Sequence, residues 1–163
     1  MSALEPVYRV LFVCTGNTCR SPMAAAALVD ELRPEAGRIE VSSAGTAAWE
    51  GQPATAYSVE VARTDGVDLA SHRSRRVTPD LLRQADLVLV MERGHLSAVQ
   101  ALGADPKRTF VLSEYPDPGE PVLPLSDPFG GSLESYEECW RRIRRHVRRA
   151  APHIVEASRA RSV

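Results

Sequence analysis

The chain has 163 residues, of which 44% are hydrophobic and 25% charged, and its formal net charge is −1. This size and composition are typical of one globular domain, and they exclude a long disordered protein, a collagen-like repeat and a small disulfide scaffold. The only cysteines are Cys14, Cys19 and Cys139, and no apolar run is long enough to span a membrane. We therefore expect one domain over residues 1–163 in a reducing cytoplasm, with flexible ends at 1–7 and 157–163 and no membrane partner.

The small net charge hides an uneven distribution. From Trp140 to Val163 the chain has eight arginines and one acid, and the preceding residues carry an excess of acids. The arginine-rich end is either a basic patch or the solvated face of a helix. The overall charge predicts no nucleic-acid partner.

Strand-like and helix-like segments alternate along the chain. In the first half they are a strand at Tyr8–Val13, a helix at Pro22–Leu32 capped by Ser21, a strand at Ile39–Ser43 and a helix at Thr55–Thr64. In the second half they are a helix capped by Thr78, a strand at Leu87–Met91, a helix at Arg93–Leu102, a strand at Thr109–Leu112 and a long helix capped by Ser132. The last helix has apolar residues at helical spacing: Tyr136, Trp140, Ile143, Val147 and Ile154.

This alternation predicts an α/β fold, a doubly wound parallel sheet covered by helices on both faces in three layers. In such sheets ligands bind beyond the carboxyl ends of the strands, most often at the first β–α turn. That turn is the segment Cys14–Ser21.

The segment Cys14–Ser21 is suited to holding a tetrahedral oxyanion. Thr15, Gly16, Asn17, Thr18 and Cys19 supply backbone N–H groups at a helix N-terminus, and Gly16 allows a tight turn. Arg20 presents a planar fork to two oxygens of such an anion. We expect these groups to lower the pKa of the Cys14 thiol, which would then be a thiolate nucleophile below a bound phosphate. The spacing of Cys, five residues, Arg and Ser is the signature of cysteine-dependent phosphatases.

The segment Val13–Ala24 resembles the opening of the low-molecular-weight protein tyrosine phosphatase family. Ser43-Ala44-Gly45-Thr46 and Asp127-Pro128-Phe129 resemble two further signatures of that family. The resemblance covers nearly the whole chain and is closest to the protein-arginine phosphatase branch. It implies a flavodoxin-like sheet of four parallel strands and a two-step phosphatase that needs no metal or cofactor. The implied partners are phosphorylated protein substrates, and inorganic phosphate or other oxyanions in the loop.

The resemblance also assigns roles to individual residues. Cys14 is then the nucleophile, Arg20 the phosphate clamp and Asp127 the general acid. The sequence alone offers Asp117 as a rival acid, because both aspartates precede a proline in the proline-rich segment Tyr115–Pro128. A supporting network is expected from Asn17, Ser21, Ser43 and His72, in which Asn17 adopts left-handed geometry and Ser21 donates to Cys14.

The substrate is predicted from the pocket residues. Members that act on phosphotyrosine typically have an aliphatic residue at the position of Thr18, whereas a threonine there, with Phe129 after Asp-Pro, resembles the arginine branch. Thr18 and Asp127 offer hydrogen-bond partners to a buried guanidinium, and Phe129 offers a stacking surface. Trp49, in the loop after Ser43-Ala44-Gly45-Thr46, favours the alternative, a tyrosine phosphatase. Many members of the family that act on phosphotyrosine have an aromatic residue in this loop.

The remaining alternatives concern the cysteines and the class of activity. Cys19 is either a redox partner that traps oxidised Cys14 as a disulfide or a packing residue at the helix start. Cys139 is expected to pack in the last helix. A thiol-dependent arsenate reductase would need further cysteines to relay a disulfide, and a non-catalytic phosphate-binding module would not need Asp127.

Overall fold

Four strands form one parallel sheet in the order β2-β1-β3-β4. They are β1 (Tyr8–Cys14), β2 (Ile39–Gly45), β3 (Leu87–Val90) and β4 (Thr109–Val111). The structure is a computed structural model and describes residues 6–32, 38–117 and 125–161. It confirms the expected doubly wound sheet of four parallel strands.

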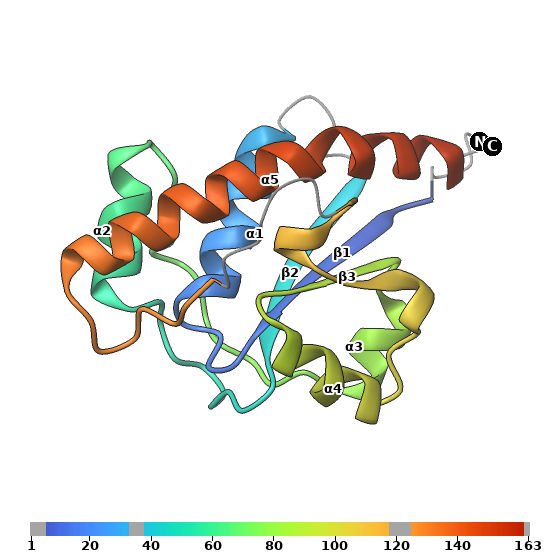
Figure 1. Cartoon of the computed structure of the whole chain (residues 1–163), viewed down its shortest axis with the longest axis horizontal. Helices are drawn as coiled ribbons and strands as arrows, with labels where there is room; N and C mark the ends of the chain where they lie inside the picture. Colours follow the sequence, from blue (N-terminus) through green and yellow to red (C-terminus); the bar gives the residue numbers. More distant parts are fainter. Residues whose placement is uncertain (1–5, 33–37, 118–124, 162–163) are drawn as a thin grey trace.

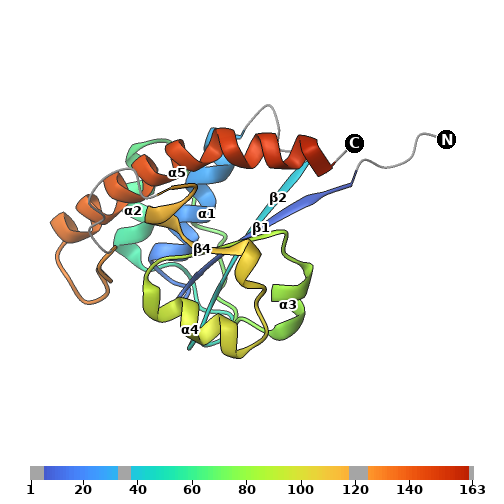
Figure 2. The same cartoon turned by 45° about the vertical axis from the view of Figure 1, so that its right-hand side comes forward.

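Helices cover both faces of the sheet, which gives the three layers seen in Figures 1 and 2. One face carries α1 (Arg20–Glu31), α2 (Ala56–Thr64) and the long α5 (Leu133–Arg161), and the other carries α3 (Pro79–Gln84) and α4 (Arg93–Ala101). Two short 3₁₀ turns, η2 (Pro106–Arg108) and η3 (Leu112–Glu114), flank β4.

The sheet is buried on both sides. In β1, Val10 and Phe12 pack in the cluster under α1 and α5, while Leu11 and Val13 pack in the cluster on the side of α3 and α4. All four residues of β3 are buried. This explains why the strand sequences are continuously apolar instead of alternating.

The predicted start of the first helix is wrong. Helix α1 begins at Arg20 with Cys19 as its cap residue, so Ser21 and Pro22 lie inside the first turn. Ser21 does not cap the helix because its hydroxyl is hydrogen-bonded to Cys14 and Asn17. At the other end of the chain, helix α5 continues to Arg161, and its Ser158 is buried. Residues 1–5 and 162–163 of the expected flexible ends lie outside the described residues.

Caps predicted from the sequence are present at Thr78 and Ser132, where each hydroxyl accepts a backbone N–H three residues later. The predicted apolar stripe of α5 is buried against the sheet and α1.

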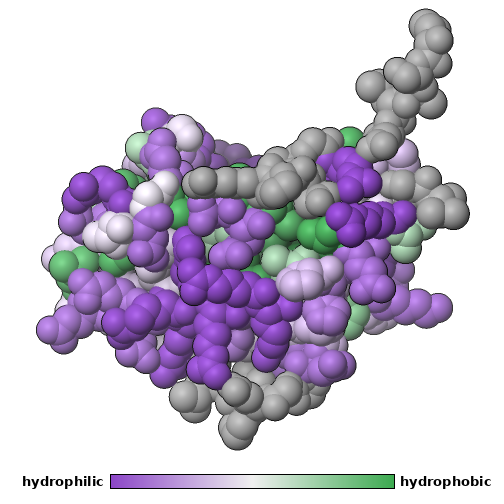
Figure 3. Space-filling view, turned by 90° about the horizontal axis from the view of Figure 1, so that it is seen from above, coloured by the Kyte–Doolittle hydropathy of each residue, from purple (hydrophilic) through white to green (hydrophobic). Residues whose placement is uncertain are grey.

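The face of the molecule on which α5 lies is mostly hydrophilic (Figure 3). Several of its arginines bind groups of this same chain: Arg144 lies 3.4 Å from Asp30 of α1, and Arg148 lies 3.1 Å from Glu31. Arg149 donates to the carbonyl oxygens of Ser113 and Tyr115. Within the described ranges, no helix combines the length and apolarity that a membrane crossing requires.

Candidate active site

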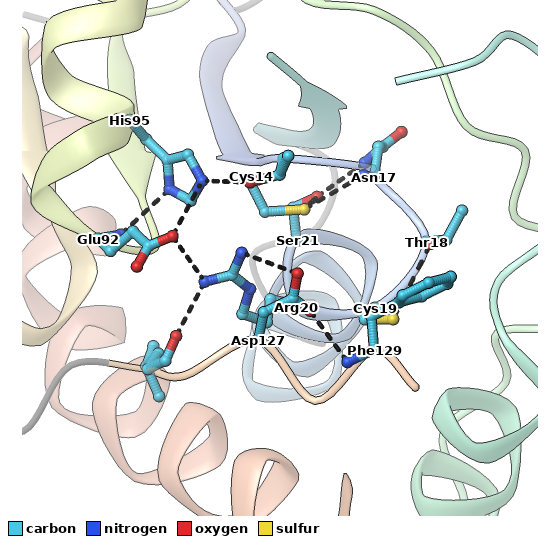
Figure 4. Close-up of polar contacts among 12 residues, drawn as sticks. Cys14, Asn17, Thr18, Cys19, Arg20, Ser21, Glu92, His95, Asp127 and Phe129 are labelled. Atoms are coloured by element: carbon cyan, nitrogen blue, oxygen red, sulfur yellow. Dashed lines mark hydrogen bonds and ion pairs between the residues drawn. The ribbon is translucent and has the colours of Figure 1, made fainter. Parts of the chain in front are cut away.

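The loop between β1 and α1 encloses the Cys14 sulfur. Cys14 is 2% exposed, and its Sγ lies 2.8 Å from Ser21 Oγ and 3.3 Å from the Asn17 backbone nitrogen, which donates to it. Figure 4 shows the sulfur facing the first turn of α1, with Arg20 alongside. The N-terminus of α1 therefore points toward the nucleophile candidate, as the sequence analysis expected.

The pKa of the Cys14 thiol is raised above its ordinary value, which contradicts the expected lowering. Burial is the largest cause, because it disfavours the charged thiolate. The Ser21 hydrogen bonds, the charge of Arg20 and the Asn17 N–H all act in the opposite direction. These three residues favour the thiolate, but the effect of burial on the pKa is larger than theirs together.

Asn17 is the centre of the network that shapes the loop. Its φ is 56°, the left-handed region, and its side-chain amide donates to Ser21 Oγ at 2.8 Å and Ser43 Oγ at 2.9 Å. Its Oδ1 accepts the Arg75 backbone N–H at 2.9 Å, and its carbonyl oxygen lies 2.7 Å from His72 Nε2. The structure thus brings Asn17, Ser21, Ser43 and His72 together, and it adds Arg75, which sequence reasoning missed.

The His72 imidazole holds the loop through its Nε2–H, since its partner is a carbonyl oxygen that can only accept. Burial lowers the pKa of His72, and the charges of Arg73 and Arg75 lower it further, against the effect of the Asn17 carbonyl. His72 is therefore a neutral donor at pH 7.

Gly45, at the end of β2, allows the backbone of β2 to approach the loop closely. A Cβ on Gly45 would lie 2.4 Å from the Thr15 carbonyl oxygen and 3.0 Å from the Asn17 nitrogen. A Cβ on Gly16 would meet nothing nearer than Thr18 Oγ1, at 3.7 Å. Packing thus explains the glycine in the signature Ser43–Thr46. The end of β2 can contact the loop backbone only if the residue at position 45 has no side chain.

Arg20 is buried, and its guanidinium is oriented by two hydrogen-bond acceptors and an ion pair. Nη1 donates to the Leu125 carbonyl oxygen at 2.9 Å and to Glu92 Oε1 at 3.3 Å, while Nη2 lies 3.6 Å from Asp127 Oδ2. Glu92 was not singled out from the sequence. A contact across 72 residues leaves no local pattern, although Glu92 immediately precedes a predicted helix.

Asp127 faces Arg20 from the segment before α5. Its side chain is 47% exposed, its Oδ1 accepts the Phe129 backbone N–H at 3.1 Å, and it lines the same pocket as Cys14 and Arg20. The rival Asp117 is exposed and does not line this pocket. The geometry thus favours Asp127 as the acid.

The pocket above the loop has a volume of about 790 Å³. Its wall includes Thr18, and its rim includes Trp49, which is 81% exposed, and Phe129, which is 69% exposed. Two large apolar side chains therefore border the opening, where they are available to a substrate. Among the described residues, no group of three or more His, Cys, Asp or Glu is arranged to hold a metal ion.

Cys19 and Cys139 are buried free thiols. Cys19 Sγ lies 3.5 Å from both Thr55 Oγ1 and Tyr136 Oη, so it links the start of α1 to α2 and α5. Burial raises the pKa of Cys139 to about 12, as suits a packing residue. Whether oxidised Cys14 pairs with Cys19 stays a prediction.

A buried cysteine at the centre of an N–H cradle, an arginine fork beside it and a carboxylic acid across the pocket define a cysteine-dependent phosphatase. The comparisons agree: the model of the low molecular weight phosphotyrosine protein phosphatase family matches residues 9–160. The chain belongs to this family.

The chain is similar both to proteins named as arginine phosphatases and to proteins named as tyrosine phosphatases. A protein-arginine-phosphatase of Geobacillus stearothermophilus is 40% identical over 79% of this chain and 84% of its own length. A probable low molecular weight protein-tyrosine-phosphatase, EpsP, of Ralstonia nicotianae is 36% identical over 89% of this chain and 94% of its own. Among solved structures, the YwlE arginine phosphatase, in a mutant with a phosphorylated active-site serine, superposes with a TM-score of 0.82 and 33% identity. That match covers 90% of this chain and 95% of the other.

Proposed function

We propose that this protein hydrolyses phosphoarginine residues of proteins in two steps, through a cysteinyl-phosphate intermediate. The observation that supports this most directly is the convergence of Cys14, Arg20 and Asp127 on one pocket whose wall includes Thr18. The similarity to protein-arginine-phosphatases points to the same substrate.

In the first step the Cys14 thiolate attacks phosphorus. The bond between phosphorus and the guanidine nitrogen breaks, and protonated Asp127 gives its proton to the leaving nitrogen. Arg20 and the loop N–H groups neutralise the charge on the phosphoryl oxygens as the transition state forms. Ser21 and the Asn17 N–H stabilise the thiolate, at 2.8 and 3.3 Å from the sulfur.

In the second step water hydrolyses the intermediate. The Asp127 carboxylate takes a proton from the water as its oxygen attacks phosphorus, and the S–P bond breaks. Inorganic phosphate leaves, and the Cys14 thiolate and protonated Asp127 are restored. The partial exposure of Asp127 allows water to reach it.

Thr18 carries the argument for phosphoarginine. Its hydroxyl makes only a weak contact within the described part of the chain, 3.9 Å to Cys19 Sγ, so it is available to a substrate N–H. A guanidinium in a pocket needs such partners, because an unpaired buried N–H costs about 1–3 kcal/mol. Phe129 at the rim offers its ring face to the planar guanidinium.

Phosphotyrosine is the second candidate substrate, and Trp49 favours it. The indole is exposed at the rim of the pocket and suits a phenyl group. The similarity to a probable tyrosine phosphatase supports the same alternative.

The test compares kcat/KM on phosphoarginine and phosphotyrosine peptides for the parent and for Thr18→Ile. We expect the parent to prefer phosphoarginine and the variant to shift the ratio toward phosphotyrosine by about tenfold or more, since the hydroxyl is lost and an apolar wall is gained. Thr18→Ser keeps the hydroxyl and is the matched control, which should retain the preference. A parent that prefers phosphotyrosine would leave the tyrosine alternative standing.

A further inference from the structure

His95, near the start of α4, contacts the loop between β1 and α1 at Thr15, whereas His72 contacts the same loop at Asn17. It is 4% exposed, and its two ring nitrogens have different partners. Nδ1 accepts the backbone N–H of Glu92 at 3.2 Å, and Nε2 lies 2.9 Å from Thr15 Oγ1. Because Nδ1 is an acceptor, the neutral ring carries its hydrogen on Nε2, and that N–H donates to Thr15.

The bond from His95 fixes what the Thr15 hydroxyl can do. Its oxygen accepts from the imidazole, so its own hydrogen remains to be donated elsewhere. Thr15 is exposed and lines the pocket beside Cys14 and Arg20. The natural acceptor at that place is a phosphoryl oxygen of the substrate.

His95 also reaches Arg20, through Glu92. The carboxylate oxygen Oε1 lies 3.3 Å from Arg20 Nη1 and 3.6 Å from His95 Nε2. Figure 4 shows the Glu92 carboxylate between the imidazole and the guanidinium, with Asp127 on the far side of Arg20. The His95 imidazole thus contacts the Thr15 hydroxyl, which lines the pocket, and the Glu92 carboxylate, which pairs with Arg20.

We propose that His95 is a positioning residue of the phosphatase reaction, which orients the Thr15 hydroxyl as a donor to the phosphoryl group and holds Glu92 against Arg20. This inference rests on the proposed function. Capping α4 does not explain the arrangement, because only Nδ1 serves the helix start, whereas the Nε2 bond joins residues 80 positions apart in the sequence.

The experiment measures kcat/KM on an aryl phosphate and the inhibition constant of inorganic phosphate for three variants. His95→Ala and Thr15→Val should each lower kcat/KM by about tenfold and weaken phosphate binding, because a hydrogen bond to a charged oxygen is lost or disordered. In the double variant the two losses should multiply less than fully, because His95 acts in part through the Thr15 hydroxyl that Thr15→Val removes. Full multiplication of the two losses would overturn the proposal.

Two conservative variants separate positioning from a purely structural role. His95→Gln keeps an acceptor and an N–H donor and should recover most of the loss, and Thr15→Ser keeps the hydroxyl and should do the same. A His95→Ala protein with a lower melting temperature but parental kcat/KM and phosphate inhibition would refute the positioning role. If His95→Ala does not fold, the pair Thr15→Val and Thr15→Ser decides, because Thr15 is on the surface, and a parental Thr15→Val would be the contrary result.

The proposed function is tested separately by Cys14→Ser. If that variant keeps turnover, the phosphatase mechanism fails, and phosphate binding measured by calorimetry still decides the role of His95. Weaker binding in His95→Ala than in the parent supports the role, and equal binding opposes it.

Discussion

At Cys14, burial and three neighbouring residues have opposite effects on the pKa of the thiol. Burial raises the pKa of the thiol, whereas Ser21, Arg20 and Asn17 favour the thiolate. A hydrogen bond to a charged group contributes about 1.5–3 kcal/mol, so losing one of these neighbours would be felt directly in the nucleophile. The sequence motif identifies which residues surround the sulfur, but the size of the desolvation effect depends on how deeply the fold buries it.

Cys14→Ser should abolish turnover and leave phosphate binding in place. A serine hydroxyl at this position is a much weaker nucleophile, while the loop N–H groups and Arg20 are unchanged. Steady-state kinetics and phosphate calorimetry on the same preparation measure the two effects. Cys139→Ser is the control, because Cys139 of α5 is not among the residues that line the active-site pocket, and this variant should keep turnover. Turnover of Cys14→Ser within tenfold of the parent would remove Cys14 from its role.

Asp127→Asn should slow phosphoenzyme formation by about 10²–10⁴-fold, most strongly with poor leaving groups, because it cannot supply the proton. Rapid-quench measurement of the first step gives the rate. Asp117→Asn is the matched control from the same proline-rich segment, and its exposed carboxylate lines no part of the pocket. If Asp117→Asn proves the more damaging change, the acid has been chosen wrongly.

At the scale of elements, the site depends on how the end of β2 meets the first β–α turn. The Thr46 N–H donates to the Cys14 carbonyl and the Ala47 N–H donates to the Thr15 carbonyl, both at 2.9 Å. These bonds draw two backbones together at Gly45. The candidate phosphate-binding loop is therefore supported by a neighbouring strand as well as by its own helix.

Gly45→Ala should destabilise the protein by about 1–3 kcal/mol and weaken phosphate binding, because the new Cβ would overlap the Thr15 carbonyl oxygen. Denaturant unfolding and phosphate calorimetry measure the two effects. Gly94→Ala is the control: a Cβ there meets nothing within 4 Å, its φ is not positive, and alanine favours a helix over glycine. Equal stability of the two variants would show that β2 does not need to approach so closely.

The strands and helices were predictable because each has a local signal. The buried strands are continuous apolar runs, and Thr78 and Ser132 are side-chain caps. The start of α1 was misplaced because Ser21 resembles a cap in sequence but binds the sulfur and Asn17 in the fold.

Cys14, Arg20 and Asp127 of the candidate site were found from their motifs, whereas Glu92 and His95 were not. Each of the latter pairs with a loop residue more than 70 positions away. A pairing of that kind depends on the order of strands in the sheet, since β3 lies next to β1 and brings α4 to the loop. Local patterns in the sequence cannot contain this information.

For the molecule as a whole, part of the positive charge of α5 is neutralised by acidic residues of α1. Arginines of α5 pair with Asp30 and Glu31 of α1, which belong to the acidic part of the chain. These pairs join two helices that also pack through apolar residues. The arginine-rich end thus serves in part to dock α5, through the largely buried side chain of Arg144 and the more exposed side chain of Arg148.

Two imidazoles from distant segments contact the loop between β1 and α1. His72 donates to the Asn17 carbonyl oxygen and His95 donates to Thr15 Oγ1. Burial is the largest cause that lowers the pKa of each, and arginine charges add to it: Arg73 and Arg75 at His72, and Arg20 at His95. Glu92 and Asp127 act against this at His95 without reversing it. Both rings therefore hold the loop in their neutral form.

The stability of the fold should decrease as the pH falls below about 6.5, the ordinary pKa of histidine. Above that pH both rings are neutral in the folded and unfolded chains and add no pH dependence. Below it the unfolded chain binds protons that the folded chain resists, so unfolding becomes more favourable until the lowered folded pKa values are passed. Denaturant unfolding between pH 7.5 and 5 measures the slope, and the double variant His72→Gln, His95→Gln should flatten it because glutamine keeps a donor but does not titrate. A parental slope in the double variant, or a protein that gains stability on acidification through this range, would show that the two imidazoles do not couple the loop to pH.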